Sequence, residues 1–189
     1  MRPQKIPTPV PPRERILQTA HTLFYRDGIR ATGIDRIIAE ATVTKVTFYR
    51  HFPSKNDLIR AFLEHRHQLW IQWFGQTLTQ YGGKLDALLP TLTKWFHRDD
   101  FRGCAFINSV GELGAVLPDV MDISRRHKTD MTVLIAALLP SSKTRMKIAQ
   151  ALALAVDGAI FRAQLDETPE AALKALGTLL KALRMSLIK

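Results

Sequence analysis

The chain has 189 residues, of which 46 % are hydrophobic and 23 % are charged, with a formal net charge of +10. This length favours one compact domain or a small domain joined to a larger one, and the composition excludes a disordered or collagen-like chain. The single Cys excludes a disulfide framework and a Cys-rich zinc module.

The hydropathy pattern predicts a soluble protein with no membrane partner. The longest apolar runs, Val133 to Leu139 and Ala151 to Val156, fall far short of the roughly 18–20 residues that a membrane span needs. The first residues are basic and rich in Pro, without an apolar segment, so we expect no secretory signal and a cytoplasmic location.

The positive charge is concentrated in the first third of the chain. Residues 1–67 contain 12 Lys or Arg and 6 Asp or Glu, whereas residues 68–189 contain 15 and 11. A small protein with a pI near 10.1 is typical of partners that are polyanions, usually nucleic acid and sometimes an anionic membrane surface. The first third is therefore where a binding motif is expected.

The chain opens with a segment that proline keeps out of a helix. Residues 1–12, MRPQKIPTPVPP, contain five Pro, which predicts a flexible arm. Two interpretations stay open for this arm: a disordered tail, or a basic arm that touches DNA. From Arg13 to Asp27–Gly28 the apolar residues recur at helical spacing; they are Ile16, Leu17, Ala20, Leu23 and Phe24.

Two short helices are predicted next, with a break at Thr42–Val43 between them. Thr32 is expected to cap the first, aided by Asp35 three residues later, and Thr44 to cap the second, from Lys45 to about His51. The buried face of the first is expected to consist of Ile34, Ile37, Ile38 and Ala41. The small core that holds the pair together is expected to consist of Ile34, Ile37, Ile38, Val43 and Phe48. Pro53–Ser54 then interrupts the chain before a longer helix.

Everything after residue 54 also has helical periodicity, so the fold class is all-α with about nine helices and no internal repeat. We expect helices at roughly 55–80, 85–98, 103–115, 119–139, 142–165 and 169–187. The last begins at Thr168–Pro169, a capping hydroxyl followed by proline. Its leucines are spaced three and four residues apart, as in a seam for a partner helix.

Two short helices joined by a tight turn in a basic segment predict a helix-turn-helix, whose second helix enters the DNA major groove. The side chains left on the polar face of this second helix are Lys45, Thr47, Tyr49, Arg50 and His51. Lys and Thr can reach base edges or phosphates, and Tyr and His suit phosphate oxygens. Lys55 would add a second contact to the DNA backbone.

Residues 13–66 closely resemble the amino-terminal DNA-binding domain of the tetracycline-repressor (TetR/AcrR-like) family of transcription regulators. The order and spacing agree over more than fifty residues without a gap. The matching marks are Ile16-Leu17, Ala20, Leu23-Phe24, Gly28, Thr32, Ile37, Ala39, Val43, Thr47-Phe48-Tyr49, His51-Phe52, Ser54-Lys55 and Asp57-Leu58.

The resemblance implies a homodimeric repressor that a small-molecule effector releases from a palindromic operator. After the Pro-rich arm at 1–12, it implies a DNA-binding domain at 13–54 and an effector-binding and dimerisation domain at 55–189. Thr44, Lys45, Val46 and Thr47 match the positions that read bases. Tyr49, His51 and Lys55 match those that grip phosphates, and Thr32 caps the bracing helix at the DNA backbone. Arg50 completes the candidate DNA-binding set.

Two residues depart from the family pattern. Thr42 stands at a turn position that is usually Gly, which costs energy if its φ is positive. Val46 stands where many members have Gly, and its methyl groups could meet a thymine methyl.

Aromatic residues gather in the middle of the chain, where they can form a core, an effector cavity, or both. The candidate pocket residues are Trp70, Trp73, Phe74, Trp95, Phe96, Cys104, Asn108 and Glu112. The segment around Cys104 is similar to a Gly-Cys stretch in one branch of the family, some members of which sense electrophiles or oxidants. An inert, buried Cys is the other interpretation. Asn108 and Glu112 could equally be helix-surface residues.

The seam of the last helix and the Ala- and Gly-rich helix before it are expected to pair with their copies in a four-helix bundle. The candidate interface residues are Leu152, Ala155, Ala159, Leu173, Leu176, Leu180, Leu183 and Leu187.

Other classes of function have weaker support. No hydrolase elbow, phosphate-binding glycine loop, dinucleotide fingerprint or zinc-protease motif is present, so we expect neither an enzyme nor a cofactor. Glu64, His65 and His67 resemble a metal site, but their spacing on a helix separates the two imidazoles, and no metal is expected. A basic helical scaffold without sequence-specific DNA binding remains the alternative class.

Overall fold

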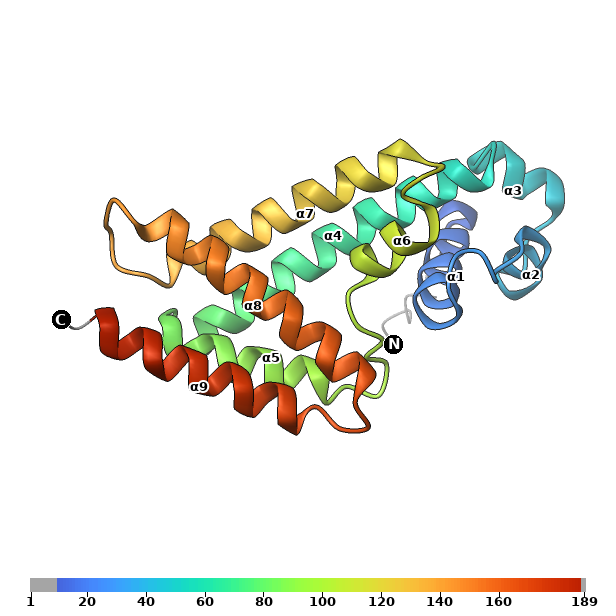
Figure 1. Cartoon of the computed structure of the whole chain (residues 1–189). Coiled ribbons are helices and arrows are strands. Elements are labelled where there is room, and N and C mark those ends of the chain that lie inside the picture. Colours follow the sequence, from blue (N-terminus) through green and yellow to red (C-terminus); the bar gives the residue numbers. More distant parts are fainter. Residues whose placement is uncertain (1–9, 188–189) are drawn as a thin grey trace, which may run out of the picture. The chain divides into compact units, whose positions relative to one another are not determined.

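The computed structural model describes residues 10–187, so the expectation for the first nine residues of the Pro-rich arm lies outside the described part. Within this part the chain contains nine α-helices, one short 3-10 helix and no strand (Figure 1). The all-α prediction is confirmed. The chain divides into two compact units, the first ending at Phe62 and the second starting at Leu63. This division falls inside a helix, whereas the sequence placed a boundary at residues 54/55.

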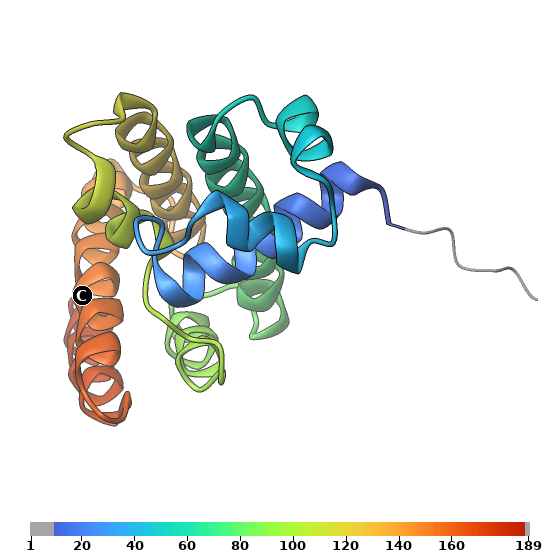
Figure 2. The same cartoon turned by 90° about the vertical axis from the view of Figure 1, so that its right-hand side faces the viewer.

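The first unit contains α1 (Pro12–Asp27), α2 (Ile34–Glu40), α3 (Lys45–His51) and the start of α4 (Lys55–Gln80). Figure 2 shows α2 lying across α1, and α3 also packs against α1. The stripe predicted for α1 is largely buried, and it packs with aromatic rings from α3 and α4. Phe24, for example, meets Phe62 edge to face with ring centroids 5.4 Å apart. The buried residues of this unit include Ile16, Leu23, Ile37, Phe48, Phe52 and Leu58.

Local signals set the helix ends in this unit. Gly28, with φ +88°, ends α1, and its N–H reaches the Phe24 carbonyl. Ser54 begins α4, because its Oγ accepts the N–H of Asp57 at 3.2 Å and its hydroxyl donates to the Asp57 carboxylate at 2.6 Å. The predicted break at Pro53–Ser54 is thus a helix start with its own cap.

The second unit contains the rest of α4 and six further elements. They are η1 (Leu85–Ala87), α5 (Leu88–Phe96), α6 (Ala105–Leu113), α7 (Pro118–Ala137), α8 (Arg145–Leu165) and α9 (Glu170–Leu187). The helix expected at 85–98 is therefore a 3-10 turn followed by a shorter α-helix. The other predicted helices lie within a few residues of the observed ones. In Figure 1, α8 lies between α7 and α9, and α5 lies beside α9.

The helix α8 is long and apolar enough to cross a membrane by length and composition alone, with 39 % of its most apolar window buried inside the protein. Its small residues allow α7 and α9 to pack closely on it: Ala149, Ala153, Val156 and Ala159 are buried. A core helix of a soluble protein has the same composition. Its other face bears Leu154, which is 75 % exposed.

Candidate nucleic-acid interface and ligand cavities

The turn between α2 and α3 has the geometry that the sequence indicated. Thr42 has φ +53°, a left-handed conformation that L-residues with a branched side chain seldom adopt. The half-buried side chain of Arg15 donates to the Thr42 carbonyl at 3.2 Å, which links α1 to this turn. Thr44 caps α3 as predicted, because its Oγ1 accepts the N–H of Thr47 at 3.1 Å.

The short helix α3 has one buried side and one exposed side. Phe48 is fully buried and lies edge to face with Tyr49, their ring centroids 5.3 Å apart. Lys45, Val46 and Arg50 are exposed, and the exposed fraction of Val46 is 77 %. Phe48 thus faces the core of this unit, and Lys45, Val46 and Arg50 lie on the exposed face of α3. Thr47 and His51 are half-buried beside this face.

The expected roles of two residues near this surface need correction or refinement. Thr32 is fully buried, and its hydroxyl donates to the Gly28 carbonyl at 2.7 Å; Gly33 is the residue that precedes α2. Thr32 therefore neither caps α2 nor reaches DNA, because its hydroxyl closes the loop after α1. Lys55 is half-buried, and its Nζ donates to the Ile29 carbonyl at 2.7 Å. Its phosphate contact stays a prediction.

Ion pairs balance the basic charge around α2. Within the described residues, by contrast, Lys45 and Arg50 of α3 form no ion pair. Arg36 bridges Asp27 and Glu40, each at 2.9 Å. Arg26 and Arg36 lower the pKa of Asp27 to about 2, although its partial burial opposes this. Asp27 and Arg36 thus tie α1 to α2, and Glu40 holds the Arg36 side chain in place.

The predicted effector-pocket aromatics form mainly a core. Trp70, Phe74, Trp95 and Phe96 are buried, and Trp73 is half-buried. Trp70 stacks on Phe74 with ring centroids 4.5 Å apart and meets Trp95 edge to face at 5.4 Å. The core interpretation is the one that this packing favours. Trp70 Nε1 nevertheless has no hydrogen-bond partner in the described part of the chain.

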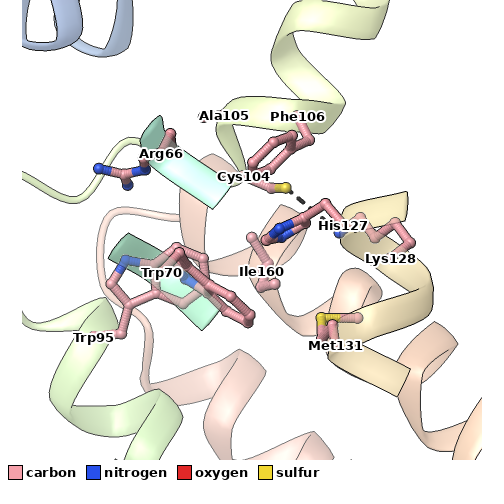
Figure 3. A pocket seen from close by; sticks show the side chains of 10 residues that line it. All are labelled: Arg66, Trp70, Trp95, Cys104, Ala105, Phe106, His127, Lys128, Met131 and Ile160. Atoms are coloured by element: carbon pink, nitrogen blue, oxygen red, sulfur yellow. Dashed lines mark hydrogen bonds between the residues drawn. The ribbon is translucent and has the colours of Figure 1, made fainter. Parts of the chain in front are cut away.

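Two of these tryptophans and Cys104 also line a small enclosed cavity (Figure 3). Its volume is about 10 Å³, which is room for one water molecule and not for an organic effector. The residues that line it come from α4, α5, α6, α7 and α8: Arg66, Trp70, Trp95, Cys104, Ala105, Phe106, His127, Lys128, Met131 and Ile160.

A buried histidine forms one wall of the small cavity. His127 is 2 % exposed, stacks on Phe106 with centroids 3.7 Å apart, and lies with its Nδ1 3.3 Å from Nδ1 of His67. Burial lowers the pKa of His127 to about 2, with Lys128 and other nearby cations adding to the effect. His127 is therefore a neutral ring inside the unit. His67 also lies 3.4 Å from the Asp130 carboxylate.

The side chain of Lys128 contacts both Cys104, the only Cys of the chain, and the carboxylate of Asp157. Its Nζ donates to Asp157 Oδ1 at 2.5 Å and to Cys104 Sγ at 3.4 Å (Figure 3 draws the contact with sulfur). Burial lowers the pKa of Lys128, but its interactions with Cys104 and Asp157 together raise this pKa above the usual value. Lys128 is thus an ammonium ion in a largely apolar setting, and Cys104 itself is buried.

A larger, open cavity of about 530 Å³ lies between α6 and α7. This volume is within the range of roughly 300–1,000 Å³ typical of small-molecule sites. None of the eight predicted pocket residues lines it. The residues that do are Phe106, Ile107, Val110, Met121, Ser124, Arg125, Lys128 and Thr129.

Helical periodicity could have pointed to part of this cavity. The run Ser124 to Lys128 looks like a solvated charged face, yet Val120, Ser124, His127 and Met131 are spaced as one buried stripe of α7. The remaining candidates have structural contacts. Asn108 donates to the Arg102 carbonyl at 3.0 Å and accepts from Gln164 at 3.4 Å. Glu112 is half-buried on α6.

The metal-like group on α4 is engaged elsewhere. Glu64 pairs with Arg126 of α7, and His67 faces His127. Among the residues described, no group of three or more His, Cys, Asp or Glu side chains is placed to hold a metal ion.

The predicted dimer seam is largely an internal contact. Leu152, Leu176 and Leu180 are buried within the single chain, where α9 packs on α5 and α8. These three leucines therefore have packing partners within their own chain, and the pairing of α8 and α9 with their copies stays a prediction. Ala159 is likewise buried, Ala155, Leu173 and Leu183 are half-buried, and the side chain of Leu187 lies outside the described residues. The large apolar side chains that α8 and α9 expose are different ones: Met146, Leu154, Phe161, Leu165, Leu179 and Met185.

Comparison with known proteins places this architecture among regulators. Residues 16–62 match the family model of the bacterial regulatory proteins of the tetR family. Helix-turn-helix-type transcriptional regulators from Staphylococcus aureus, strains USA300 and N315 among others, are 30 % identical over 80 residues, which are 42 % of this chain and 43 % of theirs. The match thus spans less than half the length of these curated relatives.

Solved structures extend the similarity to both units. A TetR-family transcriptional regulator from Streptomyces coelicolor is 29 % identical, with a TM-score of 0.82 over 94 % of this chain and 96 % of its own. Escherichia coli NemR in its reduced form has a TM-score of 0.75 at 22 % identity, over 88 % of this chain and 95 % of its own. The second comparison bears on the fold alone.

Proposed function

Because the chain belongs to the TetR family of bacterial regulatory proteins, which are DNA-binding transcriptional regulators and not enzymes, we propose that it is a cytoplasmic, ligand-responsive repressor. It binds a palindromic operator as a homodimer, and a small-molecule effector bound in the second unit releases it. The observation that carries this proposal is the exposed face of α3, held in place by the buried Phe48.

The side chains of α3 divide into two kinds of DNA contact. Lys45 and Val46 stand in the first turn of the helix, where a recognition helix meets base edges, and Thr44 and Thr47 flank them. Tyr49, Arg50 and His51 follow toward the end of the helix, where hydroxyl, guanidinium and imidazole groups suit phosphate oxygens. Base contacts should set the sequence that is read, and phosphate contacts should set affinity for any duplex.

The test is fluorescence anisotropy of the purified protein on duplexes from its own upstream region and on scrambled duplexes, at two salt concentrations. We expect specific binding that is tighter by about 10³ or more. Tyr49→Ala should weaken binding to all sequences, whereas Lys45→Ala should also cost about 1–3 kcal/mol of discrimination at one base pair. Lys94→Ala, which removes an exposed cation from α5, is the matched control. Equal, salt-sensitive binding to both duplexes would leave only a basic helical scaffold.

The homodimer is proposed to form through the exposed apolar face of α8 and α9. Leu154, Phe161 and Leu165 follow one another at helical spacing on α8, with Gly158 between them, and are 75, 56 and 64 % exposed. A stripe of this kind, facing water in a single chain, is typical of an interface between copies. Sedimentation equilibrium should show a dimer that Phe161→Glu dissociates. Val116→Glu, at a residue 66 % exposed in a loop, should leave the dimer intact.

The effect of effector binding would be transmitted to the DNA-binding unit through α4, because this helix begins in the first unit and continues into the second. The operator fixes the separation of the two recognition helices at about one helical turn, roughly 34 Å, or a multiple. A ligand that shifts the population toward another separation therefore lowers operator affinity.

A second candidate is a repressor that senses electrophiles or oxidants through Cys104. The specific observation in its favour is the ammonium of Lys128, 3.4 Å from Sγ, because thiolates beside cations are the reactive ones. Burial of Cys104 opposes it. Under this hypothesis, iodoacetamide should modify the native protein and release DNA, and Cys104→Ser should abolish both effects. A native protein that resists iodoacetamide for hours would eliminate the hypothesis.

A further inference from the structure

One residue that lines the open cavity between α6 and α7, Ser124, has a buried hydroxyl without a hydrogen-bond partner in the described part of the chain. Ser124 is 6 % exposed, and its Oγ makes no hydrogen bond within the described part of the chain. Thr129 and Thr132, on the same helix, donate to the carbonyls of Arg125 and Lys128, four residues earlier, at 3.0 and 2.7 Å. A buried hydroxyl without a partner costs free energy, so this group calls for an atom that the protein does not supply.

A cation lies one helical turn away on the same lining. The ammonium of Lys128 has three donor hydrogens, and its contacts with Asp157 and Cys104 use two of them. The lining also includes Arg125, which is paired with Asp122 at 2.9 Å at the exposed rim, and it includes no acid. The rest of the wall is apolar: Phe106, Ile107, Val110 and Met121.

We propose that this cavity binds a small apolar carboxylate. The hydrocarbon body packs against Ile107, Val110 and Met121, and the carboxylate accepts hydrogen bonds from Ser124 Oγ and Lys128 Nζ. A neutral alcohol would be a weaker acceptor than a carboxylate for the third hydrogen of Lys128 Nζ, and an amine would place a second cation beside it. Binding of the carboxylate in this cavity does not depend on the proposed function. The further step, that this carboxylate is the effector of the repressor, rests on it.

Isothermal titration calorimetry of the full-length protein without DNA tests the head group. The probes share one body: 6-phenylhexanoate, 6-phenylhexan-1-ol and 6-phenylhexylamine. We expect the carboxylate to bind about tenfold or more tightly than the alcohol, and the amine to bind weakest. Equal affinity for the acid and the alcohol, or preference for the amine, would overturn the proposal.

Variants then place the binding site. Ser124→Ala should weaken 6-phenylhexanoate binding about three- to tenfold. Ser109→Ala is the matched control, because Ser109 is equally buried but donates to the Ala105 carbonyl and does not line this cavity. Lys128→Met should remove the preference for acid over alcohol. Since that change leaves Asp157 without its partner, Ile107→Trp, which fills the cavity from an exposed position, provides a second test. Equal effects of the two serine variants would refute the site.

The outcomes also separate this inference from the proposed function. Specific operator binding without any binding of 6-phenylhexanoate would refute the ligand class and leave the regulator intact. Binding of the acid that Ser124→Ala weakens, without release of operator DNA, would support the site and refute its role as the effector site.

Discussion

The buried histidine of α7 makes the stability of the second unit depend on pH in a way that can be calculated. His127 is 2 % exposed, and its pKa falls from 6.5 to about 2 on folding, chiefly because burial penalises the imidazolium. The unfolded chain therefore binds a proton at this residue below pH 6.5 that the folded chain does not bind. A group of this kind stabilises the fold above its unfolded pKa, and this stability is lost as the pH falls.

The size of the effect follows from the unfolded pKa alone, provided that the folded ring stays neutral. Each pH unit below 6.5 costs about 1.36 kcal/mol, so lowering the pH from 7.5 to 5 should cost about 2 kcal/mol through this one residue. His127→Gln, which keeps polar atoms but cannot titrate, should therefore lose about 2 kcal/mol less over the same interval.

Urea unfolding followed by tryptophan fluorescence is the assay. All three Trp residues, Trp70, Trp73 and Trp95, belong to the second unit, so the signal reports that unit. Protein concentration is held constant, because association would shift the midpoint. Equal losses in the native protein and in His127→Gln would show that the folded ring takes up a proton, and would refute the reasoning. His127→Leu is a second variant with the same expectation.

Three further predictions concern local structure. Thr44→Ala should destabilise the first unit by about 1 kcal/mol through loss of the α3 cap, whereas Thr44→Ser should not, as thermal circular dichroism can check. In the same measurement, Phe48→Ala should lower the free energy of unfolding by about 3–5 kcal/mol, because Phe48 is fully buried. Val46→Ala should lower it by less than about 0.5 kcal/mol, because Val46 is 77 % exposed. Similar losses for the two variants would contradict the assignment of the buried and exposed faces. Gly103→Ala should destabilise the second unit in urea, because φ is +75° there and the new Cβ would lie 1.9 Å from Gln164 Oε1. Adding Gln164→Ala should restore part of the loss, and no restoration would argue against that contact.

Much of the first unit could be predicted because its determinants are local. The stripe of α1, the cap at Thr44, the start at Ser54 and the strained Thr42 each depend on residues within a few positions of one another. Short-range rules therefore predicted the helix-turn-helix and its exposed face. Thr32 is the exception. Its sequence position suits a cap, but the loop after α1 folds back so that its hydroxyl meets Gly28 instead.

In the second unit the sequence determined the helices, and tertiary packing decided their faces. A leucine seam on α9 has the same spacing whether its partner is another chain or α5 and α8 of its own chain, and only the fold shows that Leu176 and Leu180 face inward. The same holds for α7, where a run that reads as a charged surface contains the buried His127 and Ser124. Periodicity specifies which residues share a face, but which face is covered depends on elements that are distant in sequence.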